Sequence, residues 1–582
     1  MPCLFNSFDP YFKQPFGAVR AGQSVHLSLC IPEELGYVDP HLVLQKEGKY
    51  DVPVHYRMKF DGQTPHQNHF SVDVTLNDVG LYFYYFDLYT DFRRIVRGPD
   101  NCGVVSWQDG EKWQITVYEA DFETPAPIKG KVFYQIFPDR FCEGVENKPM
   151  PFPDRLYQAD KHAEPFWQPN ETGGHLNEDY FGGDLKGIQM KLPYLRKMGV
   201  DYLYLNPIFE AHSNHRYNTA DYLNVDPLLG TNEDFETLCK EAAKYGIGIV
   251  LDGVFSHTGS DSRYFNREGR YGEGGAYRDP NSPYRSWYDF DSKYKGGYRS
   301  WWGFETLPEV NEETPSFVEF ITGKGGVIDT WLNLGASGFR LDVADELPDD
   351  FIEKIRAAVK SHGEDKLLLG EVWEDATTKE AFGRRRTYLR GHGLDAVMNY
   401  PFRTALMAYL LGGGAEYFRD SMEELRENYP APAFYGAMNF LSTHDTPRLL
   451  TILGLTSPAP QTRDERAVYQ LSDSDLARGM SLLKLAALIL YTFPGSPMLY
   501  YGDEAGMQGF EDPFNRGTYP WGRENAELVR YFQQLGALRK SHEALQSGTI
   551  VYHAAQGRAL AFSRRTEHDH CLTAVNAGDE PV

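Results

Sequence analysis

Three acidic residues stand in sequence contexts that could bring them to one reaction centre. Asp342 lies in GFRLDVADE and Glu371 in LLLGEVW, each directly after a short apolar run, and Asp445 follows another such run in FLSTHDTPR. Cleavage of a glycosidic bond requires one carboxylate to attack the anomeric carbon and one carboxylic acid to protonate the leaving oxygen. The pattern therefore predicts chemistry on a sugar linkage.

The apolar runs before these residues belong to a repeated pattern of strand, loop and helix that begins at Lys131. Strands that are apolar on both faces indicate a parallel sheet covered by helices. Eight such strands predict an α/β fold with a closed (β/α)8 TIM barrel, whose strand ends converge on one mouth. The predicted strands are 132–138, 202–208, 248–255, 338–344, 367–373, 394–400, 437–443 and 497–504.

Two further regions flank the barrel. Residues 1–122 alternate between apolar and polar side chains, which predicts an N-terminal β-sandwich, immunoglobulin-like and of the carbohydrate-binding-module type. We expect the barrel to occupy 123–540, with an inserted subdomain at about 258–315 after the third strand, where rings and glycines occur without periodicity. Residues 541–582 predict a short C-terminal β domain that either packs tightly onto the barrel or is incomplete.

The composition excludes several classes of partner. A net charge of −24 argues against nucleic acid and against an anionic membrane surface, because both need a positive face on the protein. The N-terminus has no signal-peptide pattern and the longest apolar run is too short to cross a bilayer, so we expect a cytoplasmic protein. The spacing of the six cysteines suggests neither a disulfide framework nor a zinc site, so we expect reduced thiols.

More polar residues fall at the carboxyl ends of the predicted strands: Asn206, Asp252, His257, Arg340 and His444. A structural ion-pair or capping role would explain any one of them, but so many groups at one end of independent strands favour a common site. Arg340 and Asp342 face the same way on a strand, and the guanidinium would keep the carboxylate ionised. Partial desolvation beside Trp373 would favour the protonated form of Glu371, as a general acid requires.

These segments carry a family resemblance. DGVFSH, GFRLDVADE, GEVW and FLSTHDTPR resemble the four signature segments of the α-amylase family of glycoside hydrolases, and YQIFPDRF, FGGDLKGI, NHRYNTADY, LPEVN and YYGDEAGM match in order over about residues 131–525. The resemblance implies that Asp342 is the nucleophile, Glu371 the acid/base and Asp445 the stabiliser of the transition state. It also implies structural support from Asp252 and a set of substrate-binding residues: Arg340, His257, His444, Tyr217, His215, Asn206, Trp373 and Glu346.

Glu346, Thr446 and LPEVN are similar to the neopullulanase, cyclomaltodextrinase and maltogenic amylase branch of that family. The similarity implies retaining, endo-acting hydrolysis of α-1,4 (or also α-1,6) bonds in cyclodextrins, pullulan or maltodextrins, and a homodimer formed through the N-terminal domain. The chain departs from the usual pattern at Glu374, where the branch has His, and at Asn218, where the family has Asp.

The resemblance implies no cofactor for the reaction, but it does imply a structural calcium ion near CEGVENKP. The oxygen ligands available there are Glu143, Glu146, Asn147 and later Asp184, and calcium prefers six or more oxygens.

Two alternatives remain open: an α-glucan transglycosylase or isomerase on the same fold, and a barrel that binds glucan without catalysis. Retention of all three carboxylates with Arg340 speaks against the second, and no GxxxxGK phosphate cradle supports a nucleotide-sugar transferase.

Overall fold

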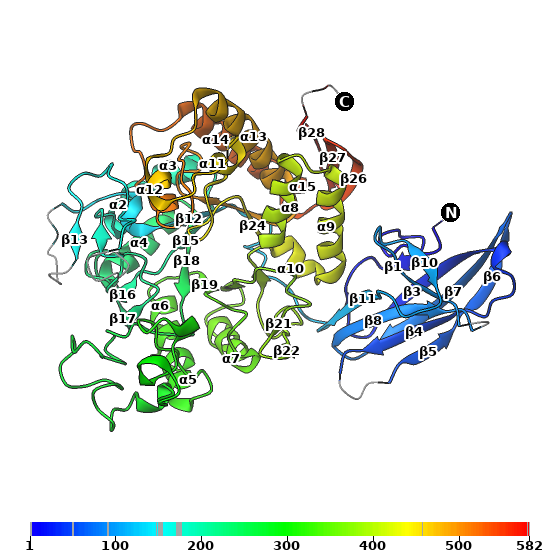
Figure 1. Cartoon of the computed structure of the whole chain (residues 1–582), viewed down its shortest axis with the longest axis horizontal. Helices are drawn as coiled ribbons and strands as arrows, with labels where there is room; N and C mark the ends of the chain where they lie inside the picture. Colours follow the sequence, from blue (N-terminus) through cyan, green and yellow to red (C-terminus); the bar gives the residue numbers. More distant parts are fainter. Residues whose placement is uncertain are drawn as a thin grey trace.

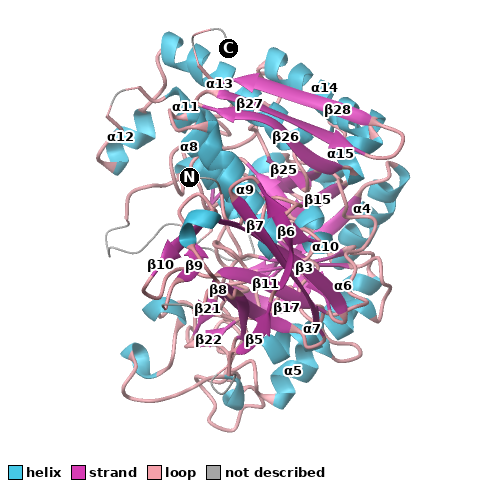
Figure 2. Ribbon diagram, turned by 90° about the vertical axis from the view of Figure 1, so that its right-hand side faces the viewer, coloured by secondary structure: helices cyan, strands magenta, loops and turns pink. Residues whose placement is uncertain are grey.

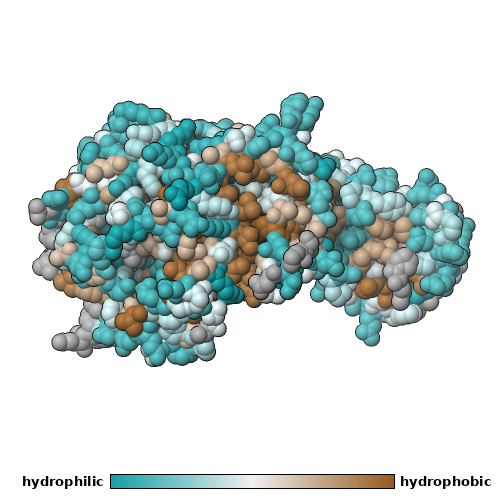
Figure 3. All heavy atoms as spheres, turned by 90° about the horizontal axis from the view of Figure 1, so that it is seen from above, coloured by the Kyte–Doolittle hydropathy of each residue, from teal (hydrophilic) through white to brown (hydrophobic). Residues whose placement is uncertain are grey.

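The computed structural model describes residues 3–48, 52–89, 92–146, 148, 155–169, 177–456, 458–578 and 580. Figure 1 shows an N-terminal β domain at one end of the molecule, a larger barrel body beside it, and a small C-terminal sheet next to α8 and α9. Viewed from above, polar side chains cover most of the surface, with apolar groups gathered toward the middle (Figure 3).

The N-terminal domain contains eleven strands among its described residues. They are β1 Lys13–Gln14, β2 Val19–Arg20, β3 Gln23–Pro32, β4 His41–Lys46, β5 Val54–Arg57, β6 Lys59–Thr64, β7 Gln67–Leu76, β8 Gly80–Asp87, β9 Arg94–Arg97, β10 Gly103–Ser106 and β11 Trp113–Tyr118, with one 3-10 turn, η1 Glu33–Leu35. One sheet has the order β1-β3-β7-β6 and the other β10-β9-β8-β11-β2, extended by β4 and β5. The predicted sandwich is confirmed: Val25, Leu27, Leu29 and Ile31 of β3 are buried between the sheets.

Cys3 and Cys102 form a disulfide, with their Cα atoms 5.7 Å apart. The expectation of six reduced cysteines is therefore wrong for this pair, while Cys30, Cys142, Cys239 and Cys571 are free. The two partners are 99 residues apart in the chain and meet because the N-terminal segment runs beside the start of β10. The spacing of the two cysteines in the sequence does not indicate that they lie close together.

The N-terminal domain packs against the barrel helix α9, Ala415–Asn428 (Figure 1). The ammonium of Lys13 lies 2.9 Å from Oε1 of Glu427, and both side chains are almost fully buried. Ser7 donates a hydrogen bond to Oε2 of the same carboxylate at 2.7 Å. A charged pair buried in this way holds the two domains in one relative position.

The barrel consists of the eight predicted strands: β12 Phe133–Ile136, β15 Tyr202–Leu205, β18 Gly248–Gly253, β19 Gly338–Leu341, β20 Leu367–Gly370, β23 Ala396–Val397, β24 Met438–Phe440 and β25 Ser496–Tyr500. Every pair in the order β23-β20-β19-β18-β15-β12-β25-β24 is parallel, and a bridge from Met398 to Met438 closes the ring. Buried side chains such as Phe133, Tyr204 and Leu369 fill the interior. All eight strand predictions are confirmed.

Helices surround the barrel, as Figure 2 shows. The pattern PDDFIEKIRAAVKSHG forms one of them, with two acidic residues in its first turn and Phe351, Ile352, Ile355 and Val359 buried. The bounds are α1 Pro138–Phe141, α2 Leu185–Met190, α3 Leu192–Lys197, α4 Asn232–Lys244, α5 Pro315–Thr322, α6 Val327–Asn333, α7 Asp349–Lys360, α8 Tyr400–Leu410, α10 Ala431–Gly436, α11 Leu449–Gly454, α12 Arg463–Val468, α13 Asp473–Thr492, α14 Ala526–Ser541 and α15 Glu543–Ser547. Across the described ranges, no helix is both long enough and apolar enough to traverse a bilayer.

Short two-stranded ladders, of which the first is parallel, and 3-10 turns occupy the loops at the barrel mouth. They are β13 Leu156–Tyr157 with β14 Asp179–Tyr180, β16 Phe209–Ala211 with β17 Thr219–Val225, β21 Glu380–Ala381 with β22 Arg384–Arg385, and the 3-10 turns η2 Arg285–Trp287, η3 Lys295–Gly297, η4 Trp301–Gly303 and η5 Phe514–Arg516. The insertion predicted after the third strand contains η2, η3 and η4, which pack around the buried rings of Tyr264, Phe265 and Trp287.

The C-terminal sheet consists of β26 Thr549–Gln556, β27 Ala559–Arg565 and β28 His570–Asn576, in antiparallel order. It packs onto the barrel, where the ring of Phe562 contacts that of Phe493. Two buried guanidinium groups lie in this seam and donate only to carbonyl oxygens: Arg539 to Gly130 and other residues, and Arg564 to Gly548 and Thr492. The predicted C-terminal β strands therefore pack against the barrel body.

Candidate active site

The acidic residues singled out in the sequence lie just beyond strand ends. Asp342 directly follows β19, Glu371 directly follows β20, and Asp445 lies five residues beyond β24. Because β19 and β20 are neighbours in the ring and parallel, their carboxyl ends meet at the same edge of the barrel.

Arg340 joins three carboxylates. Its Nη1 lies 2.8 Å from Oδ1 of Asp252 and 2.9 Å from Oδ1 of Asp342, and its Nη2 lies 2.8 Å from Oε2 of Glu371. The guanidinium itself is fully buried. The structure therefore brings together the four groups whose strand positions predicted a common site.

The charges of this cluster do not balance, since one guanidinium faces three carboxyl groups. Burial raises the pKa of Asp342 well above its ordinary value, Arg340 acts against that rise, and Glu371 and Asp252 add to it. Burial likewise raises the pKa of Asp252, and Arg340 and two tyrosine hydroxyls oppose the rise. Arg340 therefore favours the ionised form of Asp342, as expected of an adjacent guanidinium, while burial and the neighbouring carboxylates act against it.

Glu371 is oriented by donors on both carboxylate oxygens. Oε2 accepts a hydrogen bond from the backbone nitrogen of Val343 at 3.0 Å, and Oε1 accepts from Nε1 of Trp373 at 3.1 Å and from the hydroxyl of Tyr400 at 3.3 Å. The rings of Trp373 and Tyr400 stack with centroids 4.1 Å apart. Tyr400 was not predicted as a site residue, although its place at the end of the sixth predicted strand was a usable signal.

A row of hydrogen-bonded polar side chains continues from Asp252. The hydroxyl of Tyr217 donates to Oδ2 of Asp252 at 2.7 Å and accepts from Nδ2 of Asn206 at 2.9 Å. The ring of Tyr217 stacks on His444, with centroids 5.2 Å apart and planes 3° from parallel. The amide of Gln135 donates to Nδ1 of His444 at 2.9 Å, which leaves Nε2 of that ring as the donor. Gln135 was missed, although a polar residue inside the apolar first strand pointed to it.

Asp445 lies at the exposed side of this row. Its Oδ2 is 3.2 Å from Nε2 of His444, its Oδ1 is 3.6 Å from Nη2 of Arg516, and 31% of the side chain remains exposed. Burial raises the pKa of Asp445, and Arg516 acts against the rise. Arg516 comes from η5, in a loop without periodicity, so no sequence pattern indicated that it would lie at the site.

The surroundings of two predicted histidines, the buried His257 and the half-buried His215, favour the neutral ring. Burial lowers the pKa of His257 to about 4, and its Nδ1 lies 2.9 Å from the hydroxyl of Ser256. Its Nε2 is buried and has no hydrogen-bond partner among the described residues, so it is available to a ligand. His215 accepts at Nδ1 from the backbone nitrogen of Tyr217, and burial lowers the pKa of His215 as well.

Glu346 contacts the insertion. Its two carboxylate oxygens accept hydrogen bonds from Nε1 of Trp301 and Nε1 of Trp302, both at 2.9 Å. Trp301 stacks on His257, with centroids 5.4 Å apart, and the ring of Trp302 is 77% exposed. Glu346 therefore fastens two indoles of the insertion to the barrel beside the site. The sequence predicted a direct contact between Glu346 and substrate, and it did not indicate these two partners.

The described residues do not fit the calcium site that the resemblance implied. Both oxygens of Asp184 accept from backbone nitrogens, including that of Gly187, and the ammonium of Lys148 lies 2.6 Å from Oδ2. Glu143 accepts from Tyr157 and lies 3.2 Å from the ammonium of Lys161. Asn147 lies outside the described residues. Lysine ammonium groups thus stand where a cation would have to bind.

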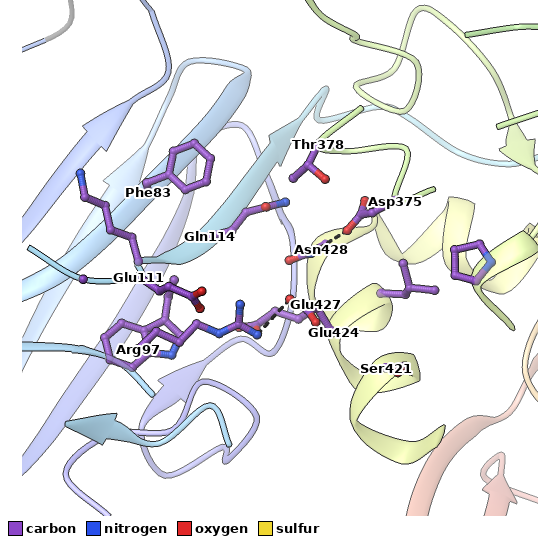
Figure 4. A pocket seen from close by; sticks show the side chains of 15 residues that line it. Phe83, Arg97, Glu111, Gln114, Asp375, Thr378, Ser421, Glu424, Glu427 and Asn428 are labelled. Carbon is purple, nitrogen blue, oxygen red and sulfur yellow. Dashed lines mark hydrogen bonds and ion pairs between the residues drawn. The ribbon is translucent and has the colours of Figure 1, made fainter. Parts of the chain in front are cut away.

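A cavity of about 700 Å³ lies behind the loop that carries Glu371, between the sandwich and α9. Figure 4 shows Arg97 and Gln114 extending from the sandwich toward this loop and α9. Arg97 forms an ion pair with Glu424 at 2.9 Å, and Gln114 donates to the hydroxyl of Thr377 at 2.9 Å. None of the predicted site residues lines this cavity, so it is separate from the carboxylate cluster.

A parallel eight-stranded barrel that gathers acidic side chains at the carboxyl ends of its strands is the framework of a glycoside hydrolase. The catalytic domain of the alpha-amylase family, described as "Alpha amylase, catalytic domain", matches residues 135–521. The chain belongs to the α-amylase family of glycoside hydrolases.

Individual relatives agree with this assignment. The amylopullulanase of Thermoanaerobacter thermohydrosulfuricus is 34% identical over 96% of this chain and 40% of its own length. The cyclomaltodextrinase of Geobacillus thermopakistaniensis is 33% identical over 79% of this chain and 71% of its own length. The solved type III pullulan hydrolase from Thermococcus kodakarensis superposes with a TM-score of 0.67 at 26% identity, covering 100% of this chain and 94% of that one. The chain spans less than half the length of the amylopullulanases that it matches.

Proposed function

We propose that this protein is a retaining, endo-acting α-glucan hydrolase that cleaves α-1,4 bonds, with α-1,6 bonds as the second candidate linkage. Its substrates would be cyclodextrins, pullulan or maltodextrins. The observation that carries the proposal is the contact of Asp342 and Glu371 with adjacent nitrogens of Arg340. Two carboxyl groups held that close at neighbouring strand ends suit a double displacement, which requires a separation of about 5–5.5 Å.

In this mechanism Asp342 attacks the anomeric carbon and forms a glycosyl ester, while Glu371 protonates the departing glycosidic oxygen. Glu371 then takes a proton from water, and that water releases the sugar from Asp342. Asp445, bordered by His444 and Arg516, would face the positive charge that develops on the sugar ring.

Neutral donors supply the contacts to sugar hydroxyls. Nε2 of His257 is buried and has no hydrogen-bond partner in the part of the chain that the structure describes, and a sugar hydroxyl in the site would satisfy it. Tyr217, which lies flat against His444, offers a ring face on which an apolar sugar face can stack. Asp252, held by Arg340 and Tyr217, supports the site without needing to contact substrate.

Exposed rings at the site extend the binding surface along a glucan chain. Trp302 is 77% exposed and Trp373 48% exposed, and each is held by a carboxylate of the site region, Glu346 or Glu371. We assign these rings to sugars beyond the cleaved bond. If they also shield the glycosyl ester from water, transfer to a second sugar competes with hydrolysis, which is the transglycosylase alternative.

We also propose a homodimer formed through the N-terminal domain. Large apolar side chains stand exposed there, with Tyr37 at 80%, Phe92 at 88% and Phe60 at 53%. Tyr37 and Phe60 also line one hollow on the sandwich. Light scattering coupled to size-exclusion chromatography would then give a molar mass of two chains. In a protein that carries both Tyr37→Ser and Phe60→Ser, the molar mass should fall to that of one chain.

A cytoplasmic location stays a prediction.

The function is tested by incubating the protein separately with β-cyclodextrin, pullulan and starch and identifying the products. Release of panose from pullulan indicates α-1,4 cleavage, and release of maltotriose indicates α-1,6 cleavage. Retention is read from the anomer that first appears, by NMR. If Asp342→Asn releases reducing sugar as fast as the unmodified protein, the mechanism is wrong and the glucan-binding alternative gains support.

A further inference from the structure

A second cluster of reactive side chains lies in the C-terminal part of the molecule and takes no part in the proposed reaction. It consists of His542, Asp569 and Cys571. His542 is the single residue between α14 and α15, Asp569 ends the turn between β27 and β28, and Cys571 is the second residue of β28. Two segments, the α14–α15 junction and the start of β28, thus meet at the edge of the sheet.

The geometry of the cluster is compact. One ligand atom from each side chain lies within 4.8 Å of the other two, and Nδ1 of His542 is 3.2 Å from Oδ1 of Asp569. Asp569 is fixed further by the backbone nitrogen of Ala544, which donates to Oδ2 at 3.0 Å. The Cys571 thiol is free of any disulfide and half-buried, and no hydrogen bond from it is recorded in the described part of the chain.

The three donor types are those that zinc prefers. Zinc binds thiolate at about 2.3 Å and imidazole or carboxylate at about 2.0–2.2 Å, so ligand atoms around one tetrahedral ion stand about 3.6 Å apart. The present separations, which reach at most 4.8 Å, would shorten to that value on binding. A solvent water would complete the fourth position, because the imidazole and the carboxylate are still 37% and 23% exposed.

We propose that His542, Asp569 and Cys571 form a binding site for one zinc ion, or for another thiophilic divalent cation, that joins the α14–α15 junction to the C-terminal sheet. The site is independent of glucan hydrolysis. Its effect would be on the stability of the seam between barrel and sheet, because an ion that binds only the folded state raises the free energy of unfolding.

Cobalt serves as the spectroscopic probe, because a thiolate bound to Co²⁺ gives a charge-transfer absorption that imidazole and carboxylate do not give. Protein stripped of metal and passed through a desalting column is titrated with Co²⁺, and Zn²⁺ is then added. We expect the absorbance of the charge-transfer band to increase until one equivalent of Co²⁺ has been added and to disappear when Zn²⁺ is added. The band should be missing in Cys571→Ser. In His542→Gln we expect the affinity to fall by more than about tenfold.

Two variants serve as matched controls. Cys142→Ser removes a free, half-buried thiol elsewhere, and His553→Gln removes an imidazole of the same sheet whose Nε2 lies 2.8 Å from the hydroxyl of Ser563. Both should keep the band and the rise in Tm on adding Zn²⁺. If Cys571→Ser does not fold by circular dichroism, Asp569→Asn and His542→Gln provide the test. A band that persists in Cys571→Ser, or a Zn²⁺-dependent rise in Tm unchanged in both His542→Gln and Asp569→Asn, would overturn the site.

Discussion

Arg340 and Asp342 lie side by side at the end of β19, with Nη1 of the guanidinium 2.9 Å from Oδ1 of the carboxylate. The same guanidinium also contacts Asp252 and Glu371. A planar group with several fixed donors can hold three acceptors at once, whereas a point charge cannot. The position of the proposed nucleophile relative to the acid/base therefore depends on this one side chain.

Arg340→Lys keeps the charge but loses the fork of donors. We expect kcat to fall by about 10²–10³, the loss typical of one preorganised electrostatic contact, while the variant still folds. Steady-state kinetics on a maltodextrin with circular dichroism would check both. Arg448→Lys is the control, since Arg448 is equally buried but pairs with Asp503. A similar kcat loss in both variants would mean that the effect is structural.

The role of Glu371 is tested through the leaving group. Glu371→Gln removes the proton donor, so kcat on maltodextrin should fall by about 10²–10⁴. On an aryl maltoside whose phenolate leaves without a proton, formation of the glycosyl ester should be much less impaired. Pre-steady-state kinetics with that substrate would show the difference. Equal losses of the first step on both substrates would exclude Glu371 as the acid.

The buried histidines predict a loss of stability in acid. The unfolded chain protonates histidine near pH 6.5, whereas burial lowers the pKa of His257 to about 4 in the folded protein. Between these values the unfolded state binds more protons, so the free energy of unfolding falls as the pH falls from about 6.5 to about 4. In His257→Asn, urea unfolding at about pH 7 and pH 5 should show a smaller decrease. An unchanged pH dependence would contradict the assigned burial effect.

Trp302 is expected to contribute to binding and little to stability. Its ring is 77% exposed, so Trp302→Ala should raise KM for long maltodextrins while leaving the free energy of unfolding within about 0.5 kcal/mol. A ring contact of about 0.5–1.5 kcal/mol corresponds to an increase in KM of about twofold to tenfold. Trp107→Ala removes a ring 67% exposed on the sandwich and should leave KM unchanged. Equal KM values for the two variants would show that Trp302 does not contribute to substrate binding.

The parts of the fold and of the site that could be predicted from the sequence are those that short, continuous sequence patterns determine. The eight barrel strands and the carboxylates at their ends follow from apolar runs and from the polar residue after each run, both visible within ten residues. Arg516, Glu346 with its two indoles, and the Cys3–Cys102 disulfide depend on loops that meet only after folding. Loops carry no periodicity, so nothing in their spacing shows which of them will become neighbours.

The buried ion pair between Lys13 of the N-terminal domain and Glu427 of α9 should contribute to the free energy of unfolding. Glu427→Gln leaves the ammonium of Lys13 buried with no full counter-charge, which should lower the free energy of unfolding by about 3–5 kcal/mol. Lys13→Met combined with Glu427→Leu removes both charges and should recover most of that loss. Chemical denaturation of the three proteins would measure it. A double variant as unstable as Glu427→Gln would show that shape, rather than charge, governs this contact.

Arg564 lies on β27 and donates to the carbonyl oxygens of Gly548 and of Thr492, the last residue of the barrel helix α13. Burial lowers the pKa of Arg564 to about 10, because little water reaches the guanidinium. If the C-terminal strands separated from the barrel, this cation would lose its carbonyl partner on α13. The barrel and its small C-terminal sheet should consequently melt together in a single calorimetric transition.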